Sequence, residues 1–344
     1  MPDYQDLIDL VRGPIPQKPL PAIWDFCPCH AGAVGGLPDL IRYYFDVDEK
    51  VRAQLKLKEV LPEALILPGI FPDLGVIVEV SAFGGQMLWF DNGAPYISPS
   101  LRSSGEIDNL KAPKPGKAGL TPVVLTQREM MRQKLKNQGM ELEKFAMSMG
   151  PAEISGLLLG YEKYYLAMHD DPERLHTLME IVSDFVIEWM RLQDVTMGGA
   201  EVLVIADHVC HQVKPAHLNE FIFPYINAVF AAFPEAIKIY HNEGYHSDRH
   251  IEAILNFGAD IWHFGSDAHH LSDLYPRVGD KIVLFGGIDP HGVMRNGTPE
   301  EVRAETRAAK NAAAGRRLVL STGTGTTPDA TLANQRAMVE EALA

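Results

Sequence analysis

The chain has 344 residues, of which 46% are hydrophobic and 22% charged, and this balance is typical of a water-soluble globular protein. Its formal net charge is −14 and its pI lies near 5.4. Nucleic acids and polyanionic substrates need a basic surface, so this charge argues against both. The composition therefore favours a small or neutral substrate, or a partner protein.

The apolar stretches are strand-sized and interrupted by charges, so no membrane-spanning helix is predicted. The N-terminus reads MPDYQDLIDL, which lacks the basic region and apolar core of a signal peptide. We therefore expect a cytoplasmic protein. Cys27, Cys29 and Cys210 are an odd number of cysteines in such a chain, which favours thiols or ligands over a disulfide framework.

Apolar runs rich in β-branched residues recur along the chain and predict eight strands, at residues 21–26, 64–71, 144–150, 201–208, 237–244, 259–265, 281–290 and 317–325. Helical patterns lie between most of them. The clearest helix begins after Asp171, a candidate cap, and ends at Gly198. Strands that alternate with helices and are apolar on both faces imply a parallel sheet. The sequence therefore predicts one domain over residues 1–344, a (β/α)8 TIM-type barrel.

One segment interrupts this alternation before the third predicted barrel strand. Residues 81–100 read SAFGGQMLWFDNGAPYISPS, with Asn92-Gly93 at the centre of an alternating pattern. Asn-Gly between two such runs is a strong signal for the two-residue turn of a β-hairpin. We therefore expect a β-hairpin inserted into the N-terminal half of the barrel.

Polar residues gather at the predicted carboxyl ends of the strands, where (β/α)8 barrels carry their catalytic groups. They are Cys27, Cys29, His30, Asp73, Asp207, His208, Cys210, His211, His241, Glu243, His263, Asp267, Asp289 and His291. Asp73 and Asp207 are candidate general acids or bases. The alternative for each aspartate is to cap the helix that follows it.

His241 and Glu243 stand two residues apart at the end of the fifth predicted strand. Alternate residues of a strand face the same side, so these two side chains project together above Ile237 and Ile239. Histidine nitrogen and carboxylate oxygen are common zinc ligands, which makes the pair a candidate metal site. A polar strand end that hydrogen-bonds its own loop is the alternative.

Three further motifs are open to two interpretations each. Residues 27–30 and 208–211 place cysteines beside histidines, which is compatible with metal ligands and equally with buried inert thiols. Residues 321–328 read STGTGTTP, which lacks the lysine of a phosphate-binding P-loop. We interpret this stretch as a tight turn after the last strand, whose N–H groups are able to face an anion.

With the strands placed, the sequence resembles the uroporphyrinogen decarboxylase superfamily, which includes the cobalamin-dependent methyltransferases. The resemblance runs nearly end to end. It rests on HAGAVGG, FPDLGVIVEVSAFGG, MGPAEI, VLVIADH with FIFPYINAVF, LFGGIDPHGVM with GTPEEV, and STGTGTTPDATLANQRAMVEEA.

The resemblance to the decarboxylases is incomplete where they hold their substrate. Their signature after the first strand is Arg-Gln-Ala-Gly-Arg, whose arginines bind the propionate and acetate groups of the tetrapyrrole. The matching residues 29–33 read Cys-His-Ala-Gly-Ala, so both arginines are absent from a chain of net charge −14. Asp73 does match the aspartate that lies under the pyrrole nitrogens. Porphyrinogen decarboxylation is therefore the second interpretation.

The resemblance to the coenzyme M methyltransferases also breaks at two positions. That branch binds zinc with a His-x-Cys pair and a later cysteine, and the matching positions here are His241, Glu243 and Thr324. Both thiolates are replaced, which argues against a thiol acceptor. The residues available to complete such a metal site are His208, His211, Cys27 and Cys29.

The resemblance implies an enzyme that takes a methyl group from an ether, by O-demethylation, from an amine, or from a similar small donor. The methyl group passes to a corrinoid carried by a separate protein that docks over the barrel mouth. His241 and Glu243 would activate the donor, with or without zinc. The residues expected to bind substrate or corrinoid are His30, His208, His211, His263, Asp289 and Thr324.

Two alternatives remain at this point, a lyase or decarboxylase of a small carboxylate and a non-catalytic corrinoid-binding protein. The crowding of ionisable groups at one barrel end favours an enzyme, because their desolvation is costly without a use. The resemblance also implies a homodimer, since barrels of this superfamily commonly pair.

Overall fold

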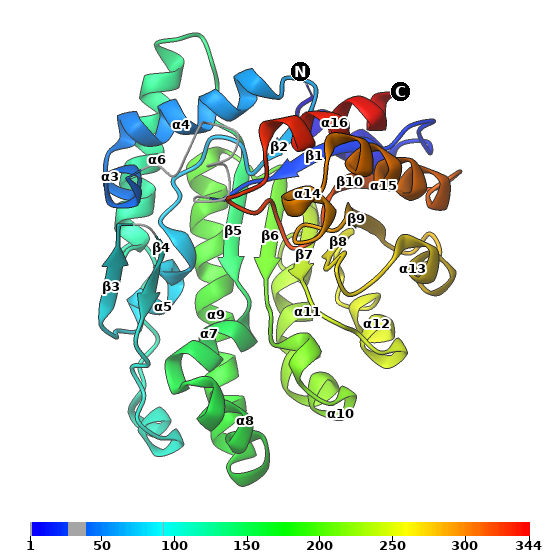
Figure 1. Cartoon of the computed structure of the whole chain (residues 1–344). Helices are drawn as coiled ribbons and strands as arrows, with labels where there is room; N and C mark the ends of the chain where they lie inside the picture. The colour runs from blue at the N-terminus through cyan, green and yellow to red at the C-terminus, as the bar shows by residue number, and fades with distance from the viewer. Residues whose placement is uncertain (1, 27–38, 92) are drawn as a thin grey trace.

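The computed structural model describes residues 2–26, 39–91 and 93–344 (Figure 1). All eight predicted barrel strands are present: β1 (Leu20–Trp24), β2 (Leu65–Leu67), β5 (Phe145–Met149), β6 (Val202–Ala206), β7 (Ile237–Asn242), β8 (Ile261–Phe264), β9 (Val283–Ile288) and β10 (Leu318–Thr322). They form one sheet in the order β2-β1-β10-β9-β8-β7-β6-β5, and every pair is parallel. The predicted TIM-type (β/α)8 architecture is confirmed.

The helices lie around the outside of the curved sheet (Figure 1). They are α1 (Tyr4–Arg12), α3 (Leu40–Phe45), α4 (Val47–Val60), α5 (Val78–Ala82), α6 (Thr121–Lys136), α7 (Pro151–Leu159), α8 (Tyr161–Asp170), α9 (Pro172–Met197), α10 (Pro215–His217), α11 (Phe223–Ala231), α12 (Asp248–Ile254), α13 (Leu271–Val278), α14 (Val293–Asn296), α15 (Pro299–Ala312) and α16 (Leu332–Leu343). Shorter turns are η1 (Gly75–Ile77), η2 (Ser104–Asn109), η3 (Cys210–Gln212) and the π-helical η4 (Leu218–Ile222).

The longest helix, α9, follows its predicted pattern with one difference at its start. Gly198 ends it in the left-handed conformation at φ 71°, where glycine carries no steric penalty. Asp171 occupies the N-cap position, but its carboxylate makes no capping hydrogen bond. It accepts hydrogen bonds from Ser104 and Arg174 instead, at 2.7 and 3.0 Å, and so ties α9 to η2.

The inserted hairpin is also confirmed. β3 (Met87–Phe90) and β4 (Gly93–Ile97) pair antiparallel, and the hairpin lies between β2 and β5 in the chain. It forms a separate two-stranded sheet beside α3 and α5 (Figure 1). The insertion therefore lies between β2 and β5, the two strands at the ends of the strand order.

The barrel interior and the helix layer have separate apolar cores. Side chains from alternate strand positions, such as Val204, Ile239 and Phe285, fill the interior. Tyr4 and Leu7 of α1 pack against this interior cluster. The opposite strand faces pack against the helices in a second, larger cluster. This alternation is what aims every second residue of a strand at the barrel axis.

β2 and β5 lie at the two ends of the strand order, and within the described part of the chain no ladder pairing joins them. Side chains fill this seam. The Phe71 and Phe145 rings meet edge to face at 5.9 Å, and Nη2 of Arg128 from α6 donates to the Phe145 carbonyl at 3.0 Å. The seam therefore brings α6 side chains into the barrel wall.

Among the described residues, no helix combines the length and the apolar character that a membrane crossing requires.

Candidate functional site

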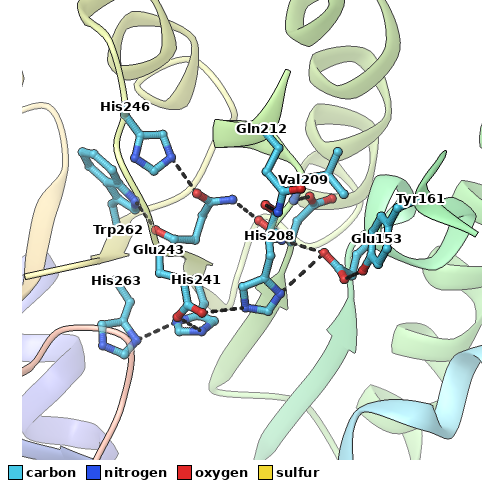
Figure 2. Close-up of polar contacts among 12 residues, drawn as sticks. Glu153, Tyr161, His208, Val209, Gln212, His241, Glu243, His246, Trp262 and His263 are labelled. Carbon is cyan, nitrogen blue, oxygen red and sulfur yellow. Dashed lines mark hydrogen bonds and ion pairs between the residues drawn. The ribbon is translucent and has the colours of Figure 1, made fainter. Parts of the chain in front are cut away.

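Three side chains meet at the carboxyl ends of β6 and β7: His208, His241 and Glu243 (Figure 2). One potential ligand atom from each lies within 4.8 Å of the others. Glu243 Oε1 is 3.8 Å from His208 Nε2, and Glu243 Oε2 is 3.6 Å from His241 Nε2. We call these three residues the triad.

Strand pairing explains why the triad forms. Ala206 of β6 is in register with His241 of β7, so the residues just beyond Ala206 lie beside Glu243. His241 follows Ile237 and Ile239 on the inward face of β7, as the alternation predicts. The expected pairing of His241 with Glu243 is confirmed as a geometric fact, and His208 is brought to the same point.

Hydrogen bonds to a backbone carbonyl determine which nitrogen of His241 carries its proton. His263 Nε2 lies 3.1 Å from the Thr322 carbonyl, which only accepts, so that nitrogen must donate. The His263 Nδ1 is then the acceptor for His241 Nδ1, 2.9 Å away. His241 is left with a lone pair on Nε2, the nitrogen that faces Glu243.

Burial keeps both members of this chain neutral. Desolvation lowers the pKa of His263 to about 3 and the pKa of His241 well below its usual range, where the neighbouring His263 and His208 lower it further. Trp24 stacks on His241 with ring centroids 5.2 Å apart. His241 is therefore a fixed neutral imidazole, which suits a metal ligand or a hydrogen-bond acceptor.

His208 has the opposite character. Its backbone N–H donates to Glu153 Oε2 at 2.8 Å, and its ring Nδ1 lies 3.5 Å from the same oxygen. Burial lowers its pKa, but Glu153 and then Glu243 outweigh this and raise the pKa of His208 to about 9. His208 lies between two carboxylates (Figure 2) and is therefore an imidazolium at neutral pH.

The two carboxylates beside His208 differ in their pKa. Burial raises the pKa of Glu243, and the nearby Asp267 adds to this, while His208 opposes it. For Glu153, the hydrogen bond and charge of His208 outweigh burial, so its pKa is lowered. Tyr161 also donates to Glu153, which leaves that carboxylate fully engaged. Glu153 is therefore a fixed anion that orients His208.

Behind the triad, the end of β7 is braced by amide and imidazole groups (Figure 2). Asn242 donates through Nδ2 to the Asp207 carbonyl and accepts through Oδ1 from His246 Nε2 at 2.6 Å. Trp262 Nε1 lies 3.4 Å from the Asn242 carbonyl. These contacts fix the strand end from which Glu243 projects.

Two cavities meet at the triad. The inner cavity, of about 280 Å3, extends from His208, His241 and Glu243 down to the seam between β2 and β5. Most of its wall is apolar, with Trp24, Phe26, Phe71, Val124, Met147 and Met149 prominent. Its other polar side chains include Asp73, Glu79, Arg128 and Gln193.

The outer cavity, of about 560 Å3, is larger and more open, and most of the residues that line it are polar. They comprise His208, His211, Gln212, Glu243, Gly244, Asp267, His291 and the loop 324–328. The Thr326 and Thr327 hydroxyls and His211 Nδ1 are buried there without a hydrogen-bond partner in the described chain. His208, Glu243 and Thr324 belong to both cavities.

Family comparison agrees with this architecture. A family model described as uroporphyrinogen decarboxylase (URO-D) matches residues 43–343. The chain belongs to the uroporphyrinogen decarboxylase family. The relationship expected from the sequence motifs is thereby confirmed.

Relatives within the URO-D family carry two kinds of name. A uroporphyrinogen decarboxylase from Pseudoalteromonas translucida is 30% identical over 168 residues, which cover 46% of this chain and 45% of the relative. Another, from Psychromonas ingrahamii, is 26% identical over 69% of this chain and 66% of its own length. A methylated-thiol–coenzyme M methyltransferase from Methanosarcina mazei is 25% identical over 69% of this chain and 62% of its own.

The alignments thus span less than two thirds of each of these three relatives. Among solved structures, a methyltransferase from Methanosarcina mazei superposes with a TM-score of 0.81 at 18% identity, over 98% of this chain and 97% of that one. A B12-independent methionine synthase from Shewanella superposes at 0.55, with 12% identity, over 94% and 97%. The URO-D fold is therefore established, and similar proteins are enzymes of both classes.

The structure places the remaining predicted site residues of this URO-D member in three settings. Asp73 lines the inner cavity, where Oδ1 accepts from the Gly75 N–H at 2.8 Å and Oδ2 from the Tyr43 hydroxyl at 3.3 Å. Lys50, fully buried, donates to the Asp73 carbonyl at 2.5 Å. Thr324 lines both cavities with φ 45°, a strained conformation for a β-branched residue.

Asp207 and Asp289 are among the candidates that neither cavity includes in its wall. Asp207 Oδ1 accepts from the Val209 N–H, and its other oxygen packs against Gly150. Burial, with Glu153 adding to it, raises the pKa of Asp207 to about 7. Asp289 accepts from the N–H groups of the two residues that follow Pro290. Both carboxylates bind N–H groups of their own turns; Asp207 does not cap η3, and its catalytic role stays a prediction.

The other candidates line the outer cavity, bond to His241, or lie outside the described residues. His211 lines the outer cavity, and His263 acts through His241. His30, with Cys27 and Cys29, lies outside the described residues. Cys210 is a buried free thiol whose pKa burial raises, so it is no ready metal ligand.

Proposed function

We propose that this URO-D family member is a methyltransferase, which moves a methyl group from a small ether or amine donor to a corrinoid. The observation that carries the proposal is the position of the triad, whose His208 and Glu243 belong both to a mostly apolar cavity and to a more open cavity lined by polar residues. Group transfer between two bound molecules needs this arrangement, because donor and acceptor must reach the same point from opposite sides.

The triad has a donor set that fits a divalent metal such as zinc. His241 offers the Nε2 lone pair that its tautomer leaves open, and His263 supplies the hydrogen bond that metal-bound histidines typically make through their other nitrogen. His208 Nε2, once metal binding has displaced its proton, and a Glu243 oxygen would complete three protein ligands. A metal held there supplies Lewis acidity at the heteroatom of the donor.

The outer cavity has groups that fit a corrinoid rim. The unpartnered Thr326 and Thr327 hydroxyls and the free His211 nitrogen are available to the amide side chains of such a ligand. A corrinoid supplies a nucleophilic cobalt as methyl acceptor. Because the cavity is open, we propose that a separate carrier protein presents the corrinoid over it.

The chain's own residues set up the transfer. Trp24 and the methionines of β5 hold the apolar body of the donor and exclude water. The bond between the methyl carbon and the heteroatom breaks, its electron pair stays on the heteroatom, and the acceptor's pair forms the new bond. The heteroatom then takes a proton. In a metal-free enzyme, His208 is the donor of that proton, because Glu153 and Glu243 keep it charged.

A carboxy-lyase that acts on a small acid is the second candidate, and Asp73 favours it. Its carboxylate is held on the inner cavity wall by the Gly75 N–H and the Tyr43 hydroxyl, at the position that matches the decarboxylase aspartate. A tetrapyrrole with its many carboxylates is the poorer substrate, since the two arginines that would hold them are absent from the sequence.

The deciding experiment measures metal content and methyl transfer on the same preparations. The wild type, His241→Ala, Glu243→Ala and the double variant are analysed by plasma mass spectrometry, then mixed with cob(I)alamin and a panel of methoxy and methylamino compounds. We expect metal in the wild type, its loss in each variant, and a fall in methyl transfer of roughly a thousandfold. The double variant should fall no further, because the residues act as one unit.

His270→Ala is the matched control, since His270 is exposed at the start of α13. Methyl transfer by a wild type that contains no metal would move the proton-donor role to His208. A wild type that transfers no methyl group from any donor, nor exchanges it with methylcobalamin, refutes the proposal. If corrinoid binding then persists equally in all variants, the protein is a non-catalytic binder, and carbon dioxide release from small acids would identify the lyase.

A further inference from the structure

We infer that the donor bound in the inner cavity carries a carboxylate, and that Arg128 holds it. This inference deepens the proposed function and rests on it, because it takes the ligand of the inner cavity to be the methyl donor. Arg128 projects from α6, is 4% exposed, and lines the inner cavity. It belongs to neither the triad nor the residues that brace it.

Arg128 uses only part of its hydrogen-bonding capacity within the described chain. Nη2 donates to the Phe145 carbonyl at 3.0 Å, whereas Nε and Nη1 are buried without a partner. Buried polar groups are nearly always hydrogen-bonded, and an unpaired charged donor costs more than a neutral one. Each of these two nitrogens is able to donate a charge-assisted hydrogen bond to a carboxylate oxygen.

The charge of Arg128 has no protein counter-ion among the described residues. Burial lowers the pKa of Arg128 to about 10, so the side chain remains charged at neutral pH. The titratable group that interacts with its charge is the Tyr4 hydroxyl. Burial raises the pKa of Tyr4, so that hydroxyl stays neutral. By contrast, Lys58 pairs with Glu143 and Lys238 pairs with Asp260.

The neighbouring polar groups on the cavity wall do not neutralise Arg128. Glu79 accepts from Trp189 Nε1 at 3.0 Å, and burial raises its pKa to about 7. Gln193 is occupied by Met147, to whose carbonyl it donates at 2.9 Å and from whose N–H it accepts at 3.3 Å. The missing partner of Arg128 is therefore supplied from inside the cavity.

Position along β5 sets the length of the ligand. Arg128 contacts the carbonyl of Phe145, the first residue of β5. Met149, the last residue of β5, pairs with Ala206, which is in register with His241 of the triad. Four residue steps at about 3.3 Å each separate them by roughly 13 Å. The donor is thus an elongated monocarboxylate with an apolar or aromatic body, and its methyl-bearing heteroatom lies at the end opposite the carboxylate.

The test uses calorimetric titration of the purified full-length protein with matched pairs of probes. Each pair is a 4-methoxyphenyl carboxylate, from the benzoate to the butanoate, and its neutral primary amide. In the wild type, at least one acid should bind on the order of tenfold to a hundredfold more tightly than its amide. Arg128→Gln should abolish that preference while keeping one donor for the Phe145 carbonyl.

Arg128→Met removes both the charge and the donor, and thermal melting of each variant shows whether it folds. Arg132→Gln is the control, because Arg132 stands one turn along α6, is exposed, and pairs with Glu129 at 2.6 Å. It should leave the preference unchanged. Equal binding of acid and amide by the wild type, or no binding of any acid, overturns the inference, as does a preference that survives in folded Arg128→Gln.

Binding and turnover separate this inference from the proposed function. A carboxylate preference that depends on Arg128, in a protein that transfers no methyl group, supports the anion site and refutes the methyltransferase. Methyl transfer from neutral donors alone, without any carboxylate preference, gives the reverse result.

Discussion

The inner and outer cavities share His208, Glu243 and Thr324 but differ in most of their other lining residues. The inner one is less open, has aromatic and methionine walls, and places a single arginine at its far end. The outer one is open and is lined by histidines, an aspartate and threonines. Under the proposed function, this contrast would separate donor and acceptor by their polarity, so that each reaches the triad from its own side. Substitutions on either side should therefore affect different ligands.

The largest effect is expected at the boundary itself, where His263 orients His241. His263→Phe keeps the ring stacked on Phe285 and removes both nitrogens of the tautomer chain. Because the open lone pair of His241 then loses its fixed position, we expect metal affinity to fall roughly 10- to 100-fold, measured by chelator competition. His176→Phe, which alters a stacked histidine on α9, is the control. Undiminished metal affinity would show that the tautomer chain does not act on the site.

A smaller effect is expected on the outer side only. Thr326→Val replaces a buried hydroxyl without a partner by a methyl group of the same shape, so the free energy of unfolding should not fall. The KM for free cob(I)alamin should rise about two- to tenfold because a hydrogen bond to the acceptor is lost. The KM for the methyl donor should stay constant, and a change in it would break the division between the cavities.

The smallest effect on turnover is expected at Glu79, which changes stability instead. Burial raises the pKa of Glu79 from 4.5 to about 7, so the folded protein binds this proton more tightly than the unfolded chain. The stabilisation is full below pH 4.5 and is lost as the pH rises through 7. Glu79→Gln cannot ionise and should gain up to ~3 kcal/mol over the wild type from pH 4.5 to 8.

Urea unfolding of both proteins at several pH values checks this expectation, and a difference that does not vary with pH would contradict it. Glu301→Gln is a suitable control, because Glu301 is exposed and its pKa is lowered by the hydrogen bonds of Thr298. Its loss should act in the opposite direction, since a lowered pKa stabilises the folded state at high pH.

Local patterns in the sequence were sufficient for the strands and for the inserted hairpin. Continuous apolar runs and an Asn-Gly turn are short-range signals, and each produced the expected element. The predicted ranges were longer than the strands, as in 64–71 against Leu65–Leu67, because the residues that flank the strand there are also apolar or glycine. Strand ends depend on ladder hydrogen bonds, which the sequence does not display.

The site was predicted only where strand alternation sets the direction of a side chain. His241 and Glu243 follow from that rule, and His208 joins them because β6 and β7 pair in register. Asp207 and Asp289 have equally suggestive positions, but their carboxylates turn back to N–H groups of their own loops. Residue spacing outside a strand does not fix such directions.

Three residues that shape the site carried no assigned role at the sequence level. Glu153 had a usable signal, since MGPAEI places a carboxylate in the first turn of the helix that follows β5. Trp24 is the last residue of β1 and only its stacking on His241 makes it notable. Arg128 lies among other charged residues of α6, and the seam that turns it inward is a tertiary feature.

The anchor of the tautomer chain is the main-chain carbonyl of Thr322 and not a side chain. Any amino acid at position 322 would offer the same carbonyl, so point substitution there cannot erase the anchor. The carbonyl is placed by the pairing of Thr322 with Ile288 across β10 and β9. The tautomer of His241 should therefore tolerate substitutions at position 322. A one-residue insertion or deletion that shifts β10 would move the carbonyl and disturb it.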